Sequence, residues 1–226
     1  MILDLIRGNA SSLDIIINLF VRVFIIFCVL PIHEFAHAFV SHKLGDDTAR
    51  LSGRLTLAPL AHIDWFGAAL MFFAGIGWAK AVPVNMRNLK TKNKKLGMAI
   101  VAFAGPLSNI LMALFFLFIY FGIAYFAPYS NTTAAIVTFF SLAAQINITL
   151  AVFNLIPVPP LDGSRLVTLV IPNKYYYQIM QYERYIAIAF MVIILTGVLN
   201  TPLGILTNAL YRGLCTIARF PFELFA

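Results

Sequence analysis

Long apolar segments dominate the chain, and short polar stretches separate them. A helix needs about 20 mostly apolar residues to cross the hydrocarbon core of a bilayer. The segments that reach or approach this length, and that we predict as membrane spans, are residues 13–41, 97–126, 134–156 and 185–199. The C-terminal residues 203–226 place Arg212 and Arg219 on one helical face, which predicts an interfacial helix or a short final span.

A shorter apolar segment, residues 66–79, contains three glycines. It is short for a span and indicates a re-entrant or hairpin element. Residues 53–57, just before it, alternate between polar and apolar, which is a weak strand signal. We therefore predict an all-α polytopic membrane protein of about four to six transmembrane helices, with a short re-entrant or β-hairpin element near residues 53–79. With no internal repeat or appended soluble domain, residues 1–226 are predicted to form one membrane-embedded domain.

The composition supports a membrane protein. Of the 226 residues, 61% are hydrophobic and 11% are charged, whereas soluble domains carry about 25% charged residues. A soluble domain of this size would leave the excess apolar side chains in water. The composition therefore excludes an ordinary soluble domain and a disordered chain.

The net charge of +7 comes largely from residues 80–95, which hold six basic residues and no acidic residue. Such loops favour the cytoplasmic side of a membrane. This preference explains the positive charge, so binding to nucleic acid is not needed to explain it. We expect contacts with membrane lipids and predict a multi-pass protein of the cell membrane. With residues 80–95 in the cytoplasm, residues 157–184 also lie there. If residues 66–79 are re-entrant, residues 42–64 are cytoplasmic and the N-terminus lies outside; if residues 66–79 span, these last two assignments reverse.

One short motif carries chemistry. His33, Glu34 and His37 form the pattern H-E-x-x-H near the C-terminal end of the first predicted span. On a helix, residues i and i+4 share a face, so both imidazoles can bind one metal ion, and the glutamate beside the first ligand can act as a general base. The alternative is a polar network packed between helices, which would also include Arg22. Because ionisable groups inside a membrane are costly and usually functional, we favour the metal site.

A catalytic zinc ion needs a third protein ligand. His42 and His62 are interpreted as interfacial or loop histidines, and Glu183 and Glu223 as weaker ligands near membrane boundaries. The acidic residues that follow the motif are interpreted as solvated loop residues: Asp46, Asp47 and Asp64.

Asp162 differs from these candidates because three prolines precede it, at positions 157, 159 and 160. Prolines cannot continue a helix, and irregular backbone at membrane depth occurs only where it is buried in protein or lines a wet cavity. Spacing alone leaves two interpretations equally open: Asp162 approaches a metal ion, or it caps the next helix in a proline-rich turn.

The chain resembles the site-2 protease family of intramembrane zinc metalloproteases. The motifs that carry the resemblance are HEFAH at 33–37, GPLSN at 105–109 and NLIPVPPLDG at 154–163. GRLTLAPLAHIDWFG at 53–67 and GWAKAVPVN at 77–85 are similar to stretches of compact prokaryotic members that lack PDZ or CBS domains.

This resemblance implies one zinc ion per chain, held by His33, His37 and Asp162, with Glu34 as catalytic base. It also implies that Asn154 positions the scissile carbonyl or stabilises its oxyanion. The active site would lie within the membrane toward the cytoplasmic side, and the substrates would be transmembrane proteins. The substrate-binding residues and the oligomeric state are left open.

Three other functions compete with an intramembrane protease. A catalytically silent membrane scaffold would keep the metal site for structure. A small ion- or proton-coupled transporter would use the buried histidines and aspartate, although it has no need of a glutamate beside the first histidine. A different membrane metalloprotease would take its third ligand from Glu183 or Glu223.

Overall fold

The computed structural model describes residues 12–74 and 77–224, and within them every regular element is a helix. The first helix runs from Ser12 to Lys43 as three consecutive pieces, α2 (Ser12–Phe24), the π-helical turn η1 (Ile25–Val29) and α3 (Leu30–Lys43). The wide turn comes just before Pro31, which has no amide hydrogen to donate to the preceding turn. The H-E-x-x-H motif therefore lies one turn beyond a local distortion of its helix.

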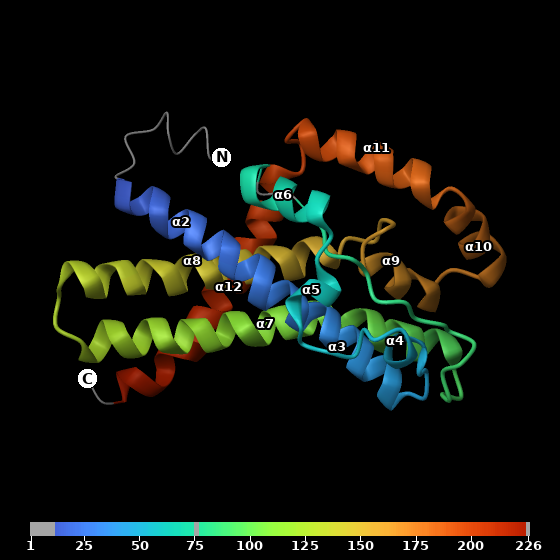
Figure 1. The fold of residues 1–226 in the computed structure, drawn as a ribbon, viewed down its shortest axis with the longest axis horizontal. Coiled ribbons are helices and arrows are strands. Elements are labelled where there is room, and N and C mark those ends of the chain that lie inside the picture. The colour runs from blue at the N-terminus through green and yellow to red at the C-terminus, as the bar shows by residue number, and fades with distance from the viewer. Residues whose placement is uncertain (1–11, 75–76, 225–226) are drawn as a thin grey trace.

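Two long helices form the centre of the molecule: α7 (Lys94–Phe126) and α8 (Asn131–Asn154), which lie antiparallel in Figure 1. Asn93 begins α7, since its side chain accepts hydrogen bonds from the amides of Lys95 and Leu96. The α2–α3 helix packs across both, with Phe24 against Phe116 and Phe139 at ring centroid distances of 5.7 and 5.4 Å.

The C-terminal third completes the bundle with shorter elements. They are α9 (Gly163–Leu166), the 3-10 turn η2 (Val167–Leu169), α10 (Asn173–Gln181), α11 (Glu183–Leu195) and α12 (Asn200–Glu223). Helix α12 crosses α7 and α8 and buries Leu214 and Ala218 against them (Figure 1). Helix α11 lies near α6 (Trp65–Ala74) in Figure 1, and residues of both helices line one cavity.

In the part of the chain that the structure describes, three helices are long and apolar enough to cross a membrane: Ser12–Lys43, Lys94–Phe126 and Asn131–Asn154. They overlap the predicted spans 13–41, 97–126 and 134–156. Helices α11 and α12, bent by 85°, count as a fourth if the pair is one broken span. The described residues therefore support three or four membrane spans, and the predicted number of four to six is not confirmed.

The predicted β-hairpin is wrong for the described part of residues 53–79. Residues 53–57 form turns and loop, and the helices that follow are α5 (Pro59–His62) and α6. The ten residues of α6 extend about 15 Å, half the thickness of the hydrocarbon core. Residues 75 and 76 of the predicted element lie outside the described residues.

An extended segment, residues 77–85, runs from the end of this region across the H-E-x-x-H helix. The buried Arg54 guanidinium holds one part of it by donating to the carbonyls of Ala61, Lys80 and Ala81. Asp46 holds its end, because its carboxylate accepts from the Asn85 amide at 2.7 Å. The alternating polar and apolar residues at 53–57 therefore do not form a strand. The polar Arg54 among them is a buried cation that fixes the backbone of neighbouring loops.

The interpretation of Asp46 as a solvated residue is wrong. Its side chain is fully buried and accepts hydrogen bonds from Ser41 in the last turn of α3 and from Thr48 at the start of α4 (Thr48–Leu51). It also accepts one from the distant segment around residue 85. A carboxylate is acceptor-only and can bond to several donors at once, so a single buried acid joins segments about 40 residues apart in the chain.

Candidate metal centre

His33 and His37 lie one turn apart on α3, and both side chains are buried. Their Nε2 atoms are 3.2 Å apart and their ring centroids 4.8 Å apart. The Nδ1 atom of His37 lies 2.8 Å from the Val101 carbonyl oxygen of α7. A bond from Nδ1–H to this carbonyl leaves the Nε2 lone pair of His37 directed at its neighbours, as a metal ligand requires.

Asp162 joins the two histidines from the loop after α8, at the same end of the antiparallel pair as the start of α7. Helix α8 ends at Asn154, and the proline-rich loop that follows turns the chain back to α3. The Oδ2 atom of Asp162 lies 3.3 Å from His33 Nε2 and 3.2 Å from His37 Nε2. Although Asp162 occupies the N-cap position of α9, its side chain makes no capping hydrogen bond. The capping interpretation is therefore wrong, and the carboxylate faces the imidazoles.

The spacing of these atoms fits a tetrahedral metal ion. Ligands roughly 2.0–2.1 Å from zinc at two corners of a tetrahedron lie about 3.3–3.4 Å apart. The three distances between His33 Nε2, His37 Nε2 and Asp162 Oδ2 are 3.2, 3.2 and 3.3 Å. The buried Asp162 Oδ2 has no hydrogen bond of acceptable geometry, which leaves its lone pairs for a metal ion. This donor set of two imidazoles and one carboxylate suits zinc and leaves one position open.

The charge state of Asp162 also suits a ligand. Burial raises the pKa of its carboxyl group, but the two imidazoles beside it have the larger combined effect and hold the pKa below its usual range. Asp162 is therefore a carboxylate at neutral pH.

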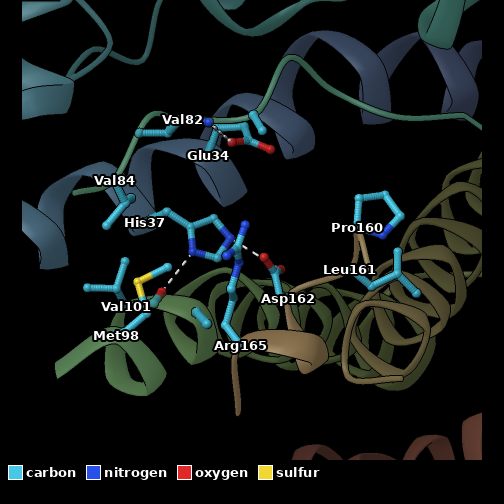
Figure 2. A pocket seen from close by; sticks show the side chains of 12 residues that line it. Glu34, His37, Val82, Val84, Met98, Val101, Pro160, Leu161, Asp162 and Arg165 are labelled. Atoms are coloured by element: carbon cyan, nitrogen blue, oxygen red, sulfur yellow. Dashed lines mark hydrogen bonds and ion pairs between the residues drawn. The ribbon is translucent and has the colours of Figure 1, made fainter. Parts of the chain in front are cut away.

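Glu34 shares a cavity with the metal ligands. This inner cavity has a volume of about 170 Å³, and its lining includes Glu34, His37 and Asp162. The Oε2 atom of Glu34 accepts a hydrogen bond of 3.0 Å from the Val82 amide, which belongs to the extended segment 77–85 (Figure 2). The backbone of that segment therefore orients the glutamate within the cavity.

Asn154 lies on the wall of a neighbouring cavity. This cavity has a volume of about 350 Å³, and its lining includes His33, Glu34 and Asp162. Its remaining wall is largely apolar and includes Trp78 and residues of α11. The structure thus places all five predicted site residues around two adjoining cavities, although Asn154 lies outside the ligand cluster.

The other candidate ligands lie elsewhere in the described residues. The Nδ1 atom of His42 lies 2.5 Å from an oxygen of Asp47, and the Nε2 atom of His62 lies 2.8 Å from the Thr56 carbonyl oxygen. The two glutamates pair with arginines: Glu183 lies 3.9 Å from Arg165, and Glu223 lies 2.7 Å from Arg219. Neither glutamate joins the cluster of possible ligands, so the geometry does not support a glutamate as the third ligand.

The sequence interpretation gave no role to two residues that shape the site, Gly105 and Val82. A Cβ atom on Gly105 would lie 2.2 Å from His37 Nε2 and 2.6 Å from His33 Cε1, so only glycine fits there. The GPLSN motif includes Gly105 but does not indicate that this glycine packs against His33 and His37. Val82 acts through its backbone amide, and because every residue except proline has such an amide, the side-chain type at this position does not indicate the role.

Comparisons with known proteins agree with this chemistry. The family model described as peptidase family M50 matches residues 121–198. The "Putative zinc metalloprotease YwhC" of Bacillus subtilis (strain 168) is 42% identical over 177 residues, which cover 76% of each chain. The chain belongs to peptidase family M50. The predicted resemblance to the site-2 proteases is thereby confirmed.

Two relatives with lower identity share part of the chain. The "Putative zinc metalloprotease Rip2" of Mycolicibacterium smegmatis is 30% identical over 141 residues, and that of Mycobacterium tuberculosis (H37Rv) is 34% identical over 140 residues. Each match covers 59% of this chain and 51% of the relative, so the chain matches about half the length of the Rip2 proteins. No solved structure gives a significant match.

Proposed function

We propose that this protein is an intramembrane zinc metalloprotease that hydrolyses peptide bonds in or near the transmembrane segments of other membrane proteins. The observation that carries the proposal is the set of distances between His33, His37 and Asp162, with Glu34 in the same cavity. The cluster forms where an apolar 32-residue helix packs against α7 and the loop after α8. Membership of the M50 family supports zinc and peptide hydrolysis as the chemistry.

His33, His37 and Asp162 would hold one zinc ion per chain. Zinc at this position supplies a Lewis acid that polarises the scissile carbonyl and makes the attacking water more acidic. The Val101 carbonyl fixes the tautomer of His37, and Gly105 leaves room for both rings. The protein thus holds its ligands in place before any substrate arrives.

Glu34 would move the protons of the reaction. Its carboxylate accepts a proton from the water whose oxygen attacks the carbonyl carbon, and it passes that proton to the nitrogen as the C–N bond breaks. The Val82 amide bonds to Oε2, so Oε1 is the oxygen that remains to face the water. The products are a free carboxylate and a free amine.

Asn154 would bind the scissile carbonyl through its side-chain amide. Its place on the cavity that touches His33, Glu34 and Asp162 supports this role. One well-placed donor to a developing oxyanion contributes about 3–4 kcal/mol to catalysis. The apolar remainder of that cavity, which includes Phe190 and Met191 of α11, suits the side chains of an unwound membrane segment.

The basic residues 80–95 support a cytoplasmic position for this end of the bundle. They lie just before α7 and in its first turn, and the site lies about three turns into that helix, next to Gly105. We therefore place the active site in the cell membrane toward the cytoplasmic side.

The test is cleavage of a membrane-helix substrate by purified protein in detergent, with zinc content measured on the same samples. Glu34→Gln removes the base and keeps the volume of the side chain. We expect this variant to bind zinc like the wild type and to lose cleavage. Glu223→Gln is the matched control, since it changes an exposed glutamate of α12 that pairs with Arg219 on the surface; it should cleave like the wild type.

Two results would contradict the proposal. Cleavage by Glu34→Gln at the rate of the wild type would exclude Glu34 as the base. Protein that holds zinc and cleaves no membrane helix would favour the catalytically silent scaffold.

A further inference from the structure

A third cavity lies beside the catalytic one and is larger, with a volume of about 890 Å³. Its walls come from the loop before α7, the first turns of α7, and the α9–η2 turn. It shares three lining residues with the inner cavity that contains Glu34: Val84, Met98 and Arg165 (Figure 2). We call this space the basic vestibule.

Five basic side chains line the basic vestibule, and no acidic residue does: Arg87, Lys92, Lys94, Lys95 and Arg165. In the described part of the chain, the three lysines and Arg87 form no ion pair. Lys94 donates to the carbonyls of Arg87 and Leu89, and Lys95 donates to that of Ile171 at 3.1 Å. These acceptors are neutral carbonyl groups, so they do not compensate the positive charge of the lysines. An anion in the vestibule would reduce the repulsion between the basic side chains.

The position of the basic vestibule points to the surface of a membrane. Helix α7 is a candidate span that begins at Lys94, so the vestibule lies at the end of a span, where lipid head groups occur. Leu169 and Val170 follow the lining residue Thr168 directly and are 47% and 86% exposed. The Lys95 bond to Ile171 ties this apolar turn to the basic wall.

We propose that the basic vestibule binds the phosphate head group of an anionic phospholipid, with the exposed apolar turn at Leu169 and Val170 beside the acyl chains. The proposal rests on the membrane location in the proposed function. A charged pocket next to an apolar surface fits an amphipathic anion, whereas a free phosphate ion would gain nothing from that surface. An acidic substrate segment is the main competing occupant, because the vestibule shares its walls with the catalytic cavity.

The test measures the dissociation constant of phosphatidylglycerol, with phosphatidylcholine for comparison, for the full chain in detergent by native mass spectrometry. The test variant carries Arg87→Gln, Lys92→Gln and Lys94→Gln. At about 1 kcal/mol for each base near a lipid surface, each replacement weakens binding roughly fivefold, so the triple variant should bind about a hundredfold more weakly. The matched control removes the same charge from exposed residues outside the vestibule: Lys90→Gln, Lys174→Gln and Arg184→Gln.

Two further arms distinguish the possible sources of the anion. Val170→Ser should weaken the binding of phosphatidylglycerol and leave the binding of inorganic phosphate unchanged. Equal affinity for inorganic phosphate and phosphatidylglycerol would overturn the lipid as the ligand. Equal losses in the test and control variants would overturn the vestibule as the site.

The last arm uses an acidic peptide. If the triple variant keeps its phosphatidylglycerol affinity and instead loses affinity for an acidic juxtamembrane peptide, the substrate is the occupant and the proposal is wrong. All binding is measured in the Glu34→Gln background, with zinc content as the test of folding. Because this readout needs no cleavage, its failure is distinguishable from failure of the proposed protease function.

Discussion

At the scale of single residues, Gly105 sets the tightest condition on the metal centre. The space that a Cβ atom would need is already occupied by the two imidazoles. Heavy atoms that are not bonded cannot approach to 2.2 Å, so any side chain at this position must displace a ligand. A residue of α7 with no functional group thereby decides whether α3 can present its histidines.

Gly105→Ala should therefore lose zinc while the helices stay intact. We expect well below one zinc ion per chain by elemental analysis, with unchanged helical circular dichroism. Gly213→Ala in α12 is the matched control, because a Cβ atom at that position meets nothing within 4 Å. It should keep its zinc and gain up to about 1 kcal/mol of helix stability. Full zinc occupancy in Gly105→Ala would contradict the packing described for this site.

Asp46 makes the stability of the loops that it joins depend on pH. Burial raises the pKa of its carboxyl group, but hydrogen bonds from Thr48, Asn85 and Asn88 outweigh burial and lower the pKa overall. A group whose pKa is lower in the folded state stabilises that state above its unfolded pKa of about 3.9, and the stabilisation is lost as the pH falls through the folded value.

Asp46→Asn should therefore unfold at a lower temperature than the wild type at neutral pH. The difference should shrink as the pH falls below about 4 and the wild-type carboxylate becomes protonated. Thermal unfolding in detergent across this pH range measures it. Asp14→Asn, at the start of α2, provides a control with the same chemical change. A gap between Asp46→Asn and the wild type that stays constant with pH would show that charge at Asp46 is irrelevant.

At the scale of elements, Arg22 fixes the short helix α6 against the first span. Its guanidinium donates to the carbonyls of Met71 and Phe72 at 3.0 and 3.1 Å, in the last turn of α6. Carbonyls in the last turn of a helix have no partner within the helix, and a cation there also compensates the helix dipole. A charge in a membrane helix thus serves to hold a neighbouring element.

Arg22→Met should loosen α6 without emptying the metal centre. Hydrogen bonds to a charged group contribute about 1.5–3 kcal/mol each, so the amides of residues 65–74 should exchange with solvent at least about tenfold faster. Hydrogen exchange with mass spectrometry measures this, and zinc content should stay at the wild-type level. Arg212→Met, on an exposed part of α12, should leave exchange in α6 unchanged. Unchanged exchange in Arg22→Met would assign the stability of α6 to its apolar contacts alone.

The long helices were predictable from sequence because their signal is local. Twenty or more apolar residues in a row indicate a helix for a physical reason that needs no knowledge of the rest of the chain. Residues 53–57 show the opposite case. Their alternation is a local pattern, but Arg54 bonds to carbonyls of Lys80 and Ala81, and this distant partner decides the loop conformation.

The metal centre likewise has parts that a local sequence pattern predicts and parts that depend on contacts between distant segments. The H-E-x-x-H motif lies within five residues, so its geometry follows from the helix period. The sequence around Asp162 allows two interpretations, because the approach of this residue to the histidines depends on how α8 packs beside α7. The contacts of Val82 and Val101 use only backbone atoms, which every residue has, and a single sequence cannot distinguish them.

At the scale of the whole molecule, the metal ligands connect the chain before the central helix pair to the chain after it. His37 precedes α7 and Asp162 follows α8, so a bound zinc ion would join α3 to the loop after α8. A ligand that binds only the folded state stabilises it by an amount that grows with its concentration over its dissociation constant. Removal of zinc would also leave a buried carboxylate against two imidazoles without its main partner.

Removal of zinc should lower the unfolding temperature of the wild type and of Glu34→Gln by the same amount. Asp162→Ala, which loses a ligand, should unfold at one temperature with or without a chelator. Scanning calorimetry in detergent, with zinc added back as the reversal, measures these values. A chelator that shifts Asp162→Ala as much as the wild type would show that the stabilising metal binds elsewhere.

The order of the ligands along the chain also matters during synthesis. His33 and His37 emerge from the ribosome with the first span, but Asp162 emerges only after α7 and α8 have been made. The nascent polypeptide therefore lacks a complete ligand set until three spans have been translated. Under the proposed function, a stalled or truncated product brings no proteolytic activity into the bilayer, so the timing of translation itself guards the membrane against premature cleavage.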